Sequence, residues 1–314
     1  MASSLLVVRP GLLTTIQDLG RFGYQASGVS VAGPMDAFSH RLANLLVGND
    51  PDAAAFEVTL IGPEFDVDAD TTIAIAGAQI NVTCDGLLLP IGASVAVSRG
   101  QRLRFGRLHQ GARAYLAVAG GIQTPAVLGS RSTHLVSHMG GVDGRALVAG
   151  DRVPVLDSAA APTRKATGLT LPTGGRARLR VLPGPQEEWF TPESFRALSS
   201  VSFRVSPRSN RMGYRLEGPP LMRSREGEPI SEPVGMGAIQ VPGAGEPILL
   251  MADRQTAGGY PKIGHVISAD LPLAGQLAPG DFVEFVTCTK QEAVAALIAR
   301  ERQLLRFSDL RGGP

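Results

Sequence analysis

Hydrophobic residues along the chain fall mostly in short runs rich in β-branched side chains, and glycine or proline separates one run from the next. This spacing is typical of β-sandwiches and β-barrels, in which each run forms a strand and each break forms a turn. The expected strands cover residues 72–76, 79–83, 94–98, 102–105, 113–118, 178–182, 201–205, 238–241, 248–251 and 282–286. The pattern therefore predicts a mainly β fold.

Helical spacing of apolar residues occurs in two segments, so a few short helices are expected beside the strands. The first helix is predicted over 36–47, where Gly48 supplies a stop. The second is predicted over 291–305, where apolar residues fall on one stripe. That stripe consists of Val294, Leu297, Ile298 and Leu305.

The length of 314 residues favours two compact domains. Residues 157–175 are rich in alanine, threonine, proline and glycine, which is the composition of an interdomain linker. The chain is thereby divided into an N-terminal β-barrel lobe at 1–156 and a C-terminal β-barrel lobe at 176–289. A C-terminal helix and tail are expected over 290–314.

Charge, cysteine content and hydropathy indicate which kinds of ligand and which cellular compartment suit the protein. The formal net charge is +2 and no run is rich in lysine or arginine, so a nucleic-acid partner is not expected. Cys84 and Cys288 lie far apart and suggest neither a disulfide framework nor a zinc site. No apolar stretch reaches the length of a membrane span. These features predict a cytoplasmic protein that binds small molecules or other proteins and holds no metal of its own.

Several common signatures of cofactor chemistry are missing from the sequence. Gly-Lys occurs nowhere, which excludes a P-loop, and the G-x-G-x-x-G and G-x-S-x-G motifs are absent too. The Met-Lys-Met phrase that carries biotin is also absent. A reaction that uses ATP would therefore need a different kind of phosphate-binding segment in this chain, or a nucleotide-binding site in a partner subunit.

Polar and charged residues gather beside glycines in four phrases. Residues 14–21 bring Gln17, Asp18 and Arg21 into one turn-like segment, which forms either a site or a satisfied Asp–Arg pair. Residues 33–36 end in Asp36, which is either a site residue or the N-cap of the helix that follows. Residues 209–213 place Asn210 and Arg211 beside a glycine that would allow a ligand to approach.

The fourth phrase, at 253–262, is the densest. It follows the apolar strand 248–251 directly, and a buried strand that ends in so many polar groups is better explained by a site than by a connector. Its candidate residues are Asp253, Arg254, Gln255, Thr256, Gly258, Gly259, Tyr260 and Lys262. Only Lys165, Lys262 and Lys290 are lysines, so a lysine at 262 indicates that a compact ammonium is needed there.

Three of these phrases, together with four other segments, resemble the allophanate hydrolase subunit 2 family, also called biotin-dependent carboxyltransferase-like. The matching segments are TTIQDLGR at 14–21, ANLLVGN at 43–49, Glu57 with Thr59 and Gly62-Pro63, PGPQ at 183–186, NRMG at 210–213, IQVP at 239–242 and DRQTAGGYPK at 253–262. They span nearly the whole chain in family order. Two departures are Pro34, where the family more often has alanine, and Asn210, where aspartate is usual; the second removes a carboxylate that could act as acid or base.

The resemblance implies two cyclophilin-like β-barrel lobes and a subunit of a bacterial ATP-dependent 5-oxoprolinase. Such a subunit would act on a small cyclic amide together with A and B subunits, would use ATP with magnesium at the level of the complex, and would be inactive alone. Two alternatives stay open: a carboxyltransferase component of a biotin-dependent, urea carboxylase-like system, or a regulatory protein that antagonises an inhibitor of a sensor kinase.

Both catalytic activities build negative charge on a carbonyl oxygen, so both need fixed cations and amide donors around one atom. Asp18, Asp36 and Asp253 could orient such donors or serve as base. We predict catalytic roles for Lys262, Arg254, Asp253 and Gln255. We predict substrate-binding roles for Gln17, Asp18, Arg21, Asp36, Asn210, Arg211, Gln240, Thr256, Gly258, Gly259 and Tyr260.

Overall fold

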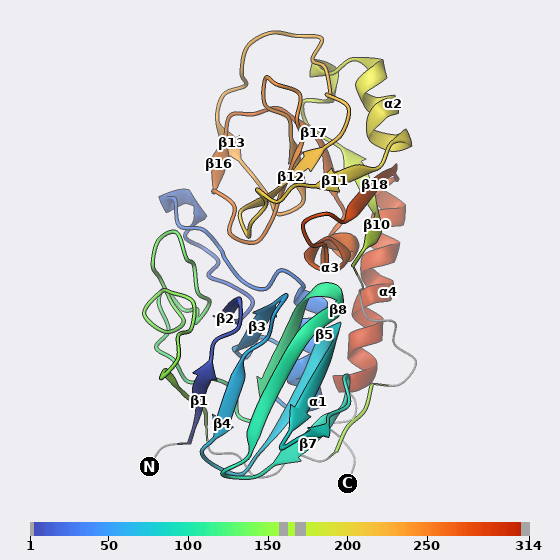
Figure 1. The fold of residues 1–314 in the computed structure, drawn as a ribbon. Coiled ribbons are helices and arrows are strands. Elements are labelled where there is room, and N and C mark those ends of the chain that lie inside the picture. The colour runs from blue at the N-terminus through green and yellow to red at the C-terminus, as the bar shows by residue number, and fades with distance from the viewer. Residues whose placement is uncertain (1–2, 157–162, 167–173, 309–314) are drawn as a thin grey trace. The chain divides into compact units, whose positions relative to one another are not determined.

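A computed structural model describes residues 3–156, 163–166 and 174–308 of the chain (Figure 1). The chain divides into two compact units. Unit 1 comprises Met1–Arg21, Ala32–Thr173 and Arg302–Pro314, and unit 2 comprises Phe22–Val31 and Gly174–Glu301. Most of the predicted linker at 157–175 and the last residues of the predicted tail lie outside the described residues.

Unit 1 is built on a nine-stranded antiparallel sheet in the order β2-β3-β8-β4-β1-β9, in which β5 pairs with β8 and also carries β6 and β7. Its strands are β1 (Ser4–Arg9), β2 (Leu13–Gln17), β3 (Ala55–Thr59), β4 (Glu64–Val67), β5 (Thr71–Cys84), β6 (Leu87–Leu88), β7 (Ser94–Val97), β8 (Arg102–Val118) and β9 (Arg152–Pro154). Figure 1 shows the sheet curling along the long strands β5 and β8.

The strands β5 and β8 are each longer than the sequence pattern predicts. Gly77 lies where the pattern ends one strand, at 76, but β5 continues through it as a series of register shifts against β8. Its φ is +105°, and a Cβ there would lie 2.5 Å from the Arg113 carbonyl oxygen, so only glycine fits. The irregularity bends β5 without ending it, as β-bulges do.

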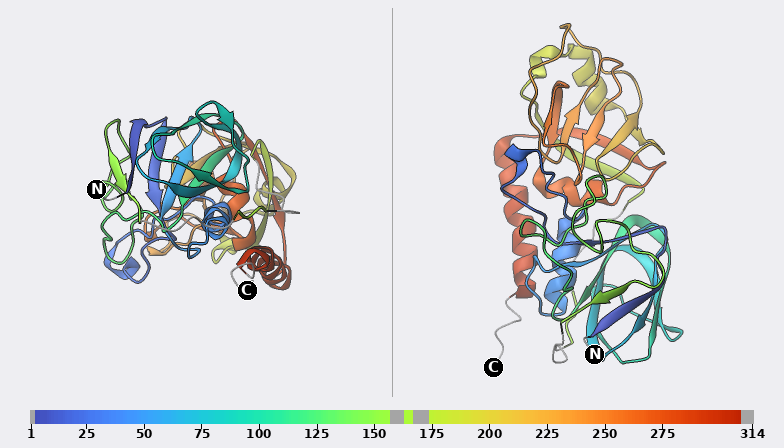
Figure 2. Two further views of the ribbon diagram at one scale, coloured as in Figure 1. Left: turned by 90° about the horizontal axis from the view of Figure 1, so that it is seen from below. Right: turned by 90° about the vertical axis from the view of Figure 1, so that its left-hand side faces the viewer.

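Helix α1 (Ala37–Leu46) agrees with the helix predicted at 36–47 and lies against the sheet (Figure 2). Asp36 caps its N-terminus, because the Ser39 backbone N–H donates to Oδ1 at 2.9 Å. Phe38 and Leu42 pack with small residues of β5 and β8 such as Ala76 and Ala117. The opposite face of the sheet encloses a separate apolar core that includes Phe56, Phe65 and Phe105.

Unit 2 is a closed barrel of seven strands in the order β10-β17-β14-β15-β12-β11-β18. Its strands are β10 (Arg176–Pro183), β11 (Phe203–Val205), β12 (Gly213–Glu217), β14 (Ala238–Gln240), β15 (Ile248–Leu250), β17 (Lys262–Val266) and β18 (Phe282–Thr287). A separate two-stranded sheet consists of β13 (Glu232–Pro233) and β16 (Ala257–Gly258). Mainly β architecture is thus confirmed in both units.

Three further helices accompany the barrel strands: α2 (Pro192–Ser200), α3 (Leu271–Gly275) and α4 (Lys290–Ser308). The predicted strand at 201–205 begins only at Phe203, because the preceding residues end α2. The stripe that indicates α4 in the sequence is largely exposed, whereas Ala293 and Ala296 pack against a buried cluster around Ile267. No helix in the described ranges combines the length and the apolar character that a membrane crossing requires.

Candidate functional site

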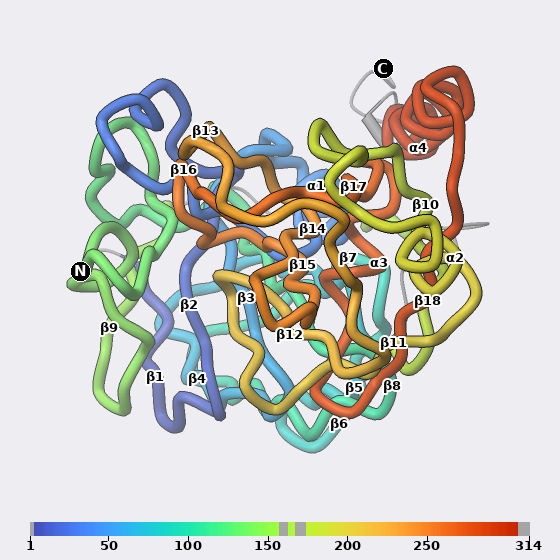
Figure 3. The backbone as a smooth tube through the Cα atoms, turned by 90° about the horizontal axis from the view of Figure 1, so that it is seen from above, coloured from blue at the N-terminus to red at the C-terminus, as the bar shows by residue number. Residues whose placement is uncertain are grey.

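The residues of the fourth phrase gather on the outer face of the barrel of unit 2, beside the β13–β16 sheet. Strand β17 pairs with β14 so that Lys262 faces Gln240, Gly264 faces Ile239 and His265 faces Ala238. The register shift near residue 263 is a β-bulge, which changes the alternation of side chains along β17. Lys262 and His265 therefore project from the same face as Gln240. Figure 3 shows β13 and β16 side by side.

Lys262 is held by two polar residues from distant segments. Its ammonium forms an ion pair with Oε1 of Glu232 on β13, and the two side chains are 7% and 38% exposed. The Gln186 side-chain amide donates to the same Glu232 oxygen, and Gln186 Oε1 accepts from the Lys262 backbone N–H at 3.1 Å. The hydrogen bond from Lys262 is the main cause that lowers the pKa of Glu232, so this carboxylate is ionised near neutral pH. Lys262 is therefore a fixed positive charge.

Two side-chain amides lie next to this ion pair. Gln255 Nε2 donates to Gln240 Oε1 at 3.3 Å, and Gln240 Nε2 lies 3.5 Å from the Tyr260 carbonyl oxygen. A Cβ at Gly258 would lie 2.7 Å from Gln240 Nε2, so this glycine leaves the space that the amide uses. Tyr260, whose carbonyl oxygen lies near Gln240, is 43% exposed.

Two other predicted binding residues contribute mainly backbone to this region. The carbonyl oxygen of Thr256 accepts from the Val234 backbone N–H at 3.0 Å, which extends the β13–β16 sheet. A Cβ at Gly259 would lie 3.4 Å from Ser231 Oγ, so a larger residue would press on the loop before β13. Both residues thus shape the loop between β16 and β17.

The guanidinium of Arg254 is partly buried and donates hydrogen bonds to backbone carbonyl groups. Its guanidinium donates to the carbonyl oxygens of Val234 at 3.2 Å and Met251 at 3.4 Å. Its own carbonyl oxygen accepts from Ser30 Oγ at 2.7 Å. Burial lowers the pKa of Arg254, although the nearby Asp253 opposes that shift. Arg254 thus fixes the loop that precedes β16.

Asp253 and Arg211 form a buried bidentate pair. Their side chains are 2% and 5% exposed, with Nε to Oδ2 at 2.9 Å and Nη2 to Oδ1 at 3.0 Å. Both oxygens of Asp253 are therefore engaged, and this geometry does not support its predicted role as base. Asn210 is exposed, and its Oδ1 accepts from the Met212 backbone N–H at 2.8 Å.

The predicted residues of the first two phrases belong to unit 1, where hydrogen bonds hold them in place. Asp18 accepts from the hydroxyls of Ser130 and Ser132 at 2.5 and 2.6 Å and from two backbone N–H groups. Burial alone would raise the pKa of Asp18, but these hydrogen bonds outweigh it and the pKa is lowered. Asp36 is fully buried as a helix cap.

Gln17 and Arg21 are similarly enclosed. The Gln17 side-chain amide donates to Thr15 Oγ1 at 3.0 Å and to the Thr133 carbonyl oxygen at 3.1 Å, and Arg21 donates to the Ser132 carbonyl oxygen. Gln17 and Arg21 are 0% and 1% exposed. These contacts give Gln17, Asp18, Arg21 and Asp36 a structural role in this conformation, and their binding roles stay predictions.

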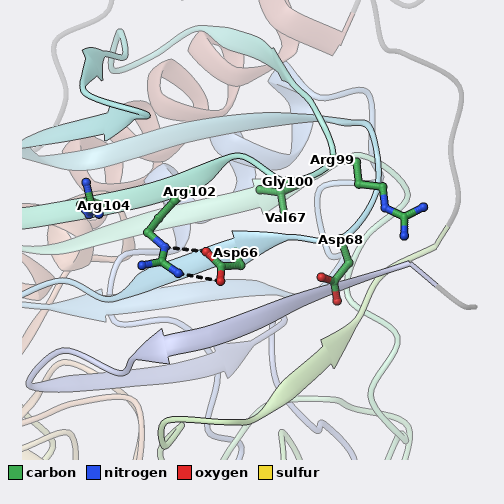
Figure 4. Close-up of a pocket in the computed structure, with 7 residues that line it drawn as sticks. All are labelled: Asp66, Val67, Asp68, Arg99, Gly100, Arg102 and Arg104. Atoms are coloured by element: carbon green, nitrogen blue, oxygen red, sulfur yellow. Dashed lines mark hydrogen bonds and ion pairs between the residues drawn. The ribbon is translucent and has the colours of Figure 1, made fainter.

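A pocket of about 420 Å³ in unit 1 contains none of the predicted site residues (Figure 4). It is lined by Asp66, Val67, Asp68, Arg99, Gly100, Arg102 and Arg104. Arg102 points at Asp66 and binds it through two hydrogen bonds of 2.6 and 2.8 Å. Asp68, another lining residue, forms an ion pair with Arg152. Because none of the polar phrases contributes to this pocket, we place the candidate site at the group around Lys262.

Sequence reasoning did not single out Glu232 or His265 and included Gln186 only within a family phrase. Glu232 precedes Lys262 by thirty positions and reaches it through the pairing of β13 with β16. No local pattern marks a lone carboxylate of this kind. Within the described ranges, no three histidine, cysteine or acidic residues form a group that could hold a metal ion.

Replacing Glu232 by glutamine should lower the turnover of the assembled complex about tenfold, a change of ~1.4 kcal/mol in the barrier. The reason is that the ammonium of Lys262 loses the anion that fixes its position. Steady-state kinetics would measure this. The thermal midpoint should change little, because a pair with a half-exposed partner contributes at most about 1 kcal/mol. Glu228→Gln, which alters the pair between the exposed Glu228 and Arg223, is the matched control, and equal effects of both variants would contradict the role of Glu232.

The model of the family described as "Carboxyltransferase domain, subdomain A and B" matches residues 27–287. The chain belongs to this carboxyltransferase family. It is 41% identical over 306 residues to the C subunit of 5-oxoprolinase from Escherichia coli (strain K12), covering 98% of this chain and 97% of that protein. The corresponding 5-oxoprolinase protein of Haemophilus influenzae is 37% identical over 89% of both chains.

Members of this family also occur within much longer proteins. The urea amidolyase of Saccharomyces cerevisiae is 37% identical over 90% of this chain, but the match spans only 16% of the yeast protein. The solved structure of the Kluyveromyces lactis urea carboxylase matches with a TM-score of 0.92 and 32% identity, covering 98% of this chain and 29% of that one. The family resemblance and the fold that it implies are therefore confirmed.

Proposed function

We propose that the chain is a subunit of an ATP-dependent 5-oxoprolinase, which opens the lactam of 5-oxoproline to give glutamate. The observation that carries this proposal is the similarity to the C subunit of 5-oxoprolinase along nearly the full length of both chains. The urea amidolyase match, in contrast, accounts for a small part of that relative. Lys262 and the neighbouring amides fit the chemistry of the lactam reaction, which builds charge on a carbonyl oxygen.

The expected reaction begins with attack of the lactam carbonyl oxygen on the γ-phosphate of ATP, which gives an activated imidate that water can open. The ammonium of Lys262 neutralises the charge that develops on the transferred oxygens, and Tyr260 supplies a second donor. Gln240 and Gln255 orient the amide edge of the substrate. ATP with magnesium acts at the level of the complex, a B subunit forms the rest of the cleft and an A subunit performs the hydrolysis.

The free cysteines Cys84 and Cys288 are both buried in the described structure and suit a reducing compartment, so we place the complex in the cytoplasm.

Reconstitution tests this function directly. The purified chain is mixed with candidate A and B subunits, and the release of ADP and glutamate is followed with and without 5-oxoproline. We expect ADP release that requires 5-oxoproline and all three proteins, and negligible turnover by the chain alone. Robust turnover by the chain alone would contradict the dependence on partners, and no turnover in any mixture would favour a regulatory binding role.

The carboxyltransferase alternative is supported by the similarity to urea amidolyase and to the urea carboxylase structure. It requires a biotin carrier and a biotin carboxylase, because the chain lacks the Met-Lys-Met phrase that attaches biotin. Turnover that depends on bicarbonate and on biotinylated carrier, with urea or another amide as acceptor, would favour this function over lactam opening.

A further inference from the structure

His265 presents an imidazole nitrogen on the face of unit 2 that carries Lys262. The bulge in β17 turns both side chains to this face. His265 Nδ1 lies 3.0 Å from the Val266 carbonyl oxygen. A carbonyl oxygen can only accept a hydrogen bond, so Nδ1 carries the hydrogen and Nε2 carries the lone pair. The tautomer that can accept a proton at Nε2 is thereby set by the backbone.

Gly235 leaves this nitrogen accessible. A Cβ at position 235 would lie 2.9 Å from His265 Nε2, closer than real Cβ contacts come. The φ of Gly235 lies outside the positive range, so its backbone does not require glycine, in contrast to Gly237 at φ +95°. Gly235 is exposed, and His265 is neither buried nor fully exposed. A side chain at position 235 would therefore crowd Nε2, which glycine leaves uncovered on that side.

The surroundings keep the imidazole neutral. Burial lowers the pKa of His265, and the positive charges of Arg254 and Lys262 lower it further, although the bond to Val266 opposes these effects. These two cations are the charged groups that act on the ring, and Glu232 is engaged with Lys262. The imidazole therefore stands in its basic form at neutral pH, as a general base must.

The carboxylates that the sequence suggests as bases are all engaged elsewhere. Asp18 accepts several hydrogen bonds and Asp36 caps α1, both in unit 1. Asp253 is bound bidentately by Arg211. Within the described part of unit 2, His265 lies on the Lys262 face and keeps the lone pair of Nε2 available, because its hydrogen is held at Nδ1.

We propose that His265 is the general base of the lactam reaction, accepting the N–H proton of the cyclic amide at Nε2; this rests on the function proposed above. As the lactam carbonyl oxygen forms a bond to the γ-phosphorus of a nucleoside triphosphate, the bond from that phosphorus to the β–γ bridging oxygen breaks. Its electron pair leaves with the nucleoside diphosphate. The N–H electron pair becomes the C=N bond of an O-phosphorylated imidate, and the proton moves to His265.

Two variants test this base in the assembled complex. His265→Gln should lower kcat about a hundredfold or more with a small change in KM, the range of a lost general base. It should also abolish the acidic limb of the pH profile of kcat/KM, which in the wild type falls below the ordinary histidine value near 6.5. Gly235→Ala should lower kcat too, because its methyl group covers Nε2. Gly243→Ala is the matched control, since a Cβ there meets nothing within 4 Å.

Added imidazole should restore part of the turnover of His265→Ala, which a purely structural histidine would not allow. Thermal midpoints within a few degrees of wild type confirm that the variants fold. If the wild-type mixture is active while His265→Gln retains kcat within about threefold and keeps the acidic limb, the base is another group and only this inference fails. If the wild-type mixture shows no ADP release that depends on 5-oxoproline, the proposed function and the base assignment fail together.

Discussion

Replacing Lys262 by alanine should lower the turnover of the reconstituted complex about a hundredfold or more, which is the scale of a lost oxyanion donor. The ammonium is the fixed positive charge on the outer face of the barrel, held by Glu232 and flanked by side-chain amides. Lys262→Arg should be nearly as damaging. Its planar guanidinium is larger than the ammonium, and the lysine side chain is only 7% exposed, so little room is available.

Steady-state kinetics of the reconstituted complex and thermal unfolding of the chain check this prediction. Stability should stay close to wild type, because Glu232 is partly exposed and can be hydrated when its partner is removed. Lys290→Ala, at the exposed start of α4, is the control and should leave turnover unchanged. Near-normal turnover of Lys262→Arg would show that charge alone suffices and that a specific ammonium is unnecessary.

Replacing Arg211 by alanine should cost about 3–5 kcal/mol of unfolding free energy, because Asp253 is left as a buried charge without its partner. The pair is bidentate and almost completely buried, which distinguishes it from the exposed ion pairs of the chain. The double variant Arg211→Met with Asp253→Leu should recover much of this loss, since it removes both charges and refills the volume. Urea titration of the purified chain measures these differences.

Arg208 offers a control for this experiment. It approaches Glu246 at 3.7 Å, and the two side chains are 64% and 58% exposed. Arg208→Ala should therefore change the unfolding free energy by no more than about 0.5 kcal/mol. If Arg211→Ala costs as little as Arg208→Ala, the buried pair does not contribute to stability as its geometry indicates.

Much of the fold could be predicted from the sequence because apolar runs and turn residues mark the strands directly. The extent of β5 and β8 could not, since Gly77 resembles a strand end although it sits in a bulge. Helix α2 has signals at its start, with Thr191 as N-cap and Pro192 in the first turn. Its few buried residues, Ser194 and Leu198, leave no clear apolar stripe.

The candidate site was predictable in part, because several of the polar residues at 253–262 lie close together in the structure, beside Gln240. Residues of other segments that lie in this cluster are not marked by any local sequence pattern. Glu232 lies there because β13 pairs with β16. His265 lies on the same face as Lys262 because of the bulge in β17. The phrase at 14–21 is also dense in polar residues. Gln17 and Asp18 hold loops of unit 1 by hydrogen bonds, and a binding role for this phrase stays a prediction.

The central claim, that the chain acts through the face formed by β13, β16 and β17, is most directly tested by hydrogen–deuterium exchange of the assembled complex. Exchange is compared with and without 5-oxoproline and a non-hydrolysable ATP analogue. The account predicts slower exchange in peptides that cover 229–236 and 254–263, with no change in peptides from the β5–β8 pair of unit 1. Unchanged exchange in both of these segments, with ligand-dependent protection confined to other parts of the chain, would contradict it.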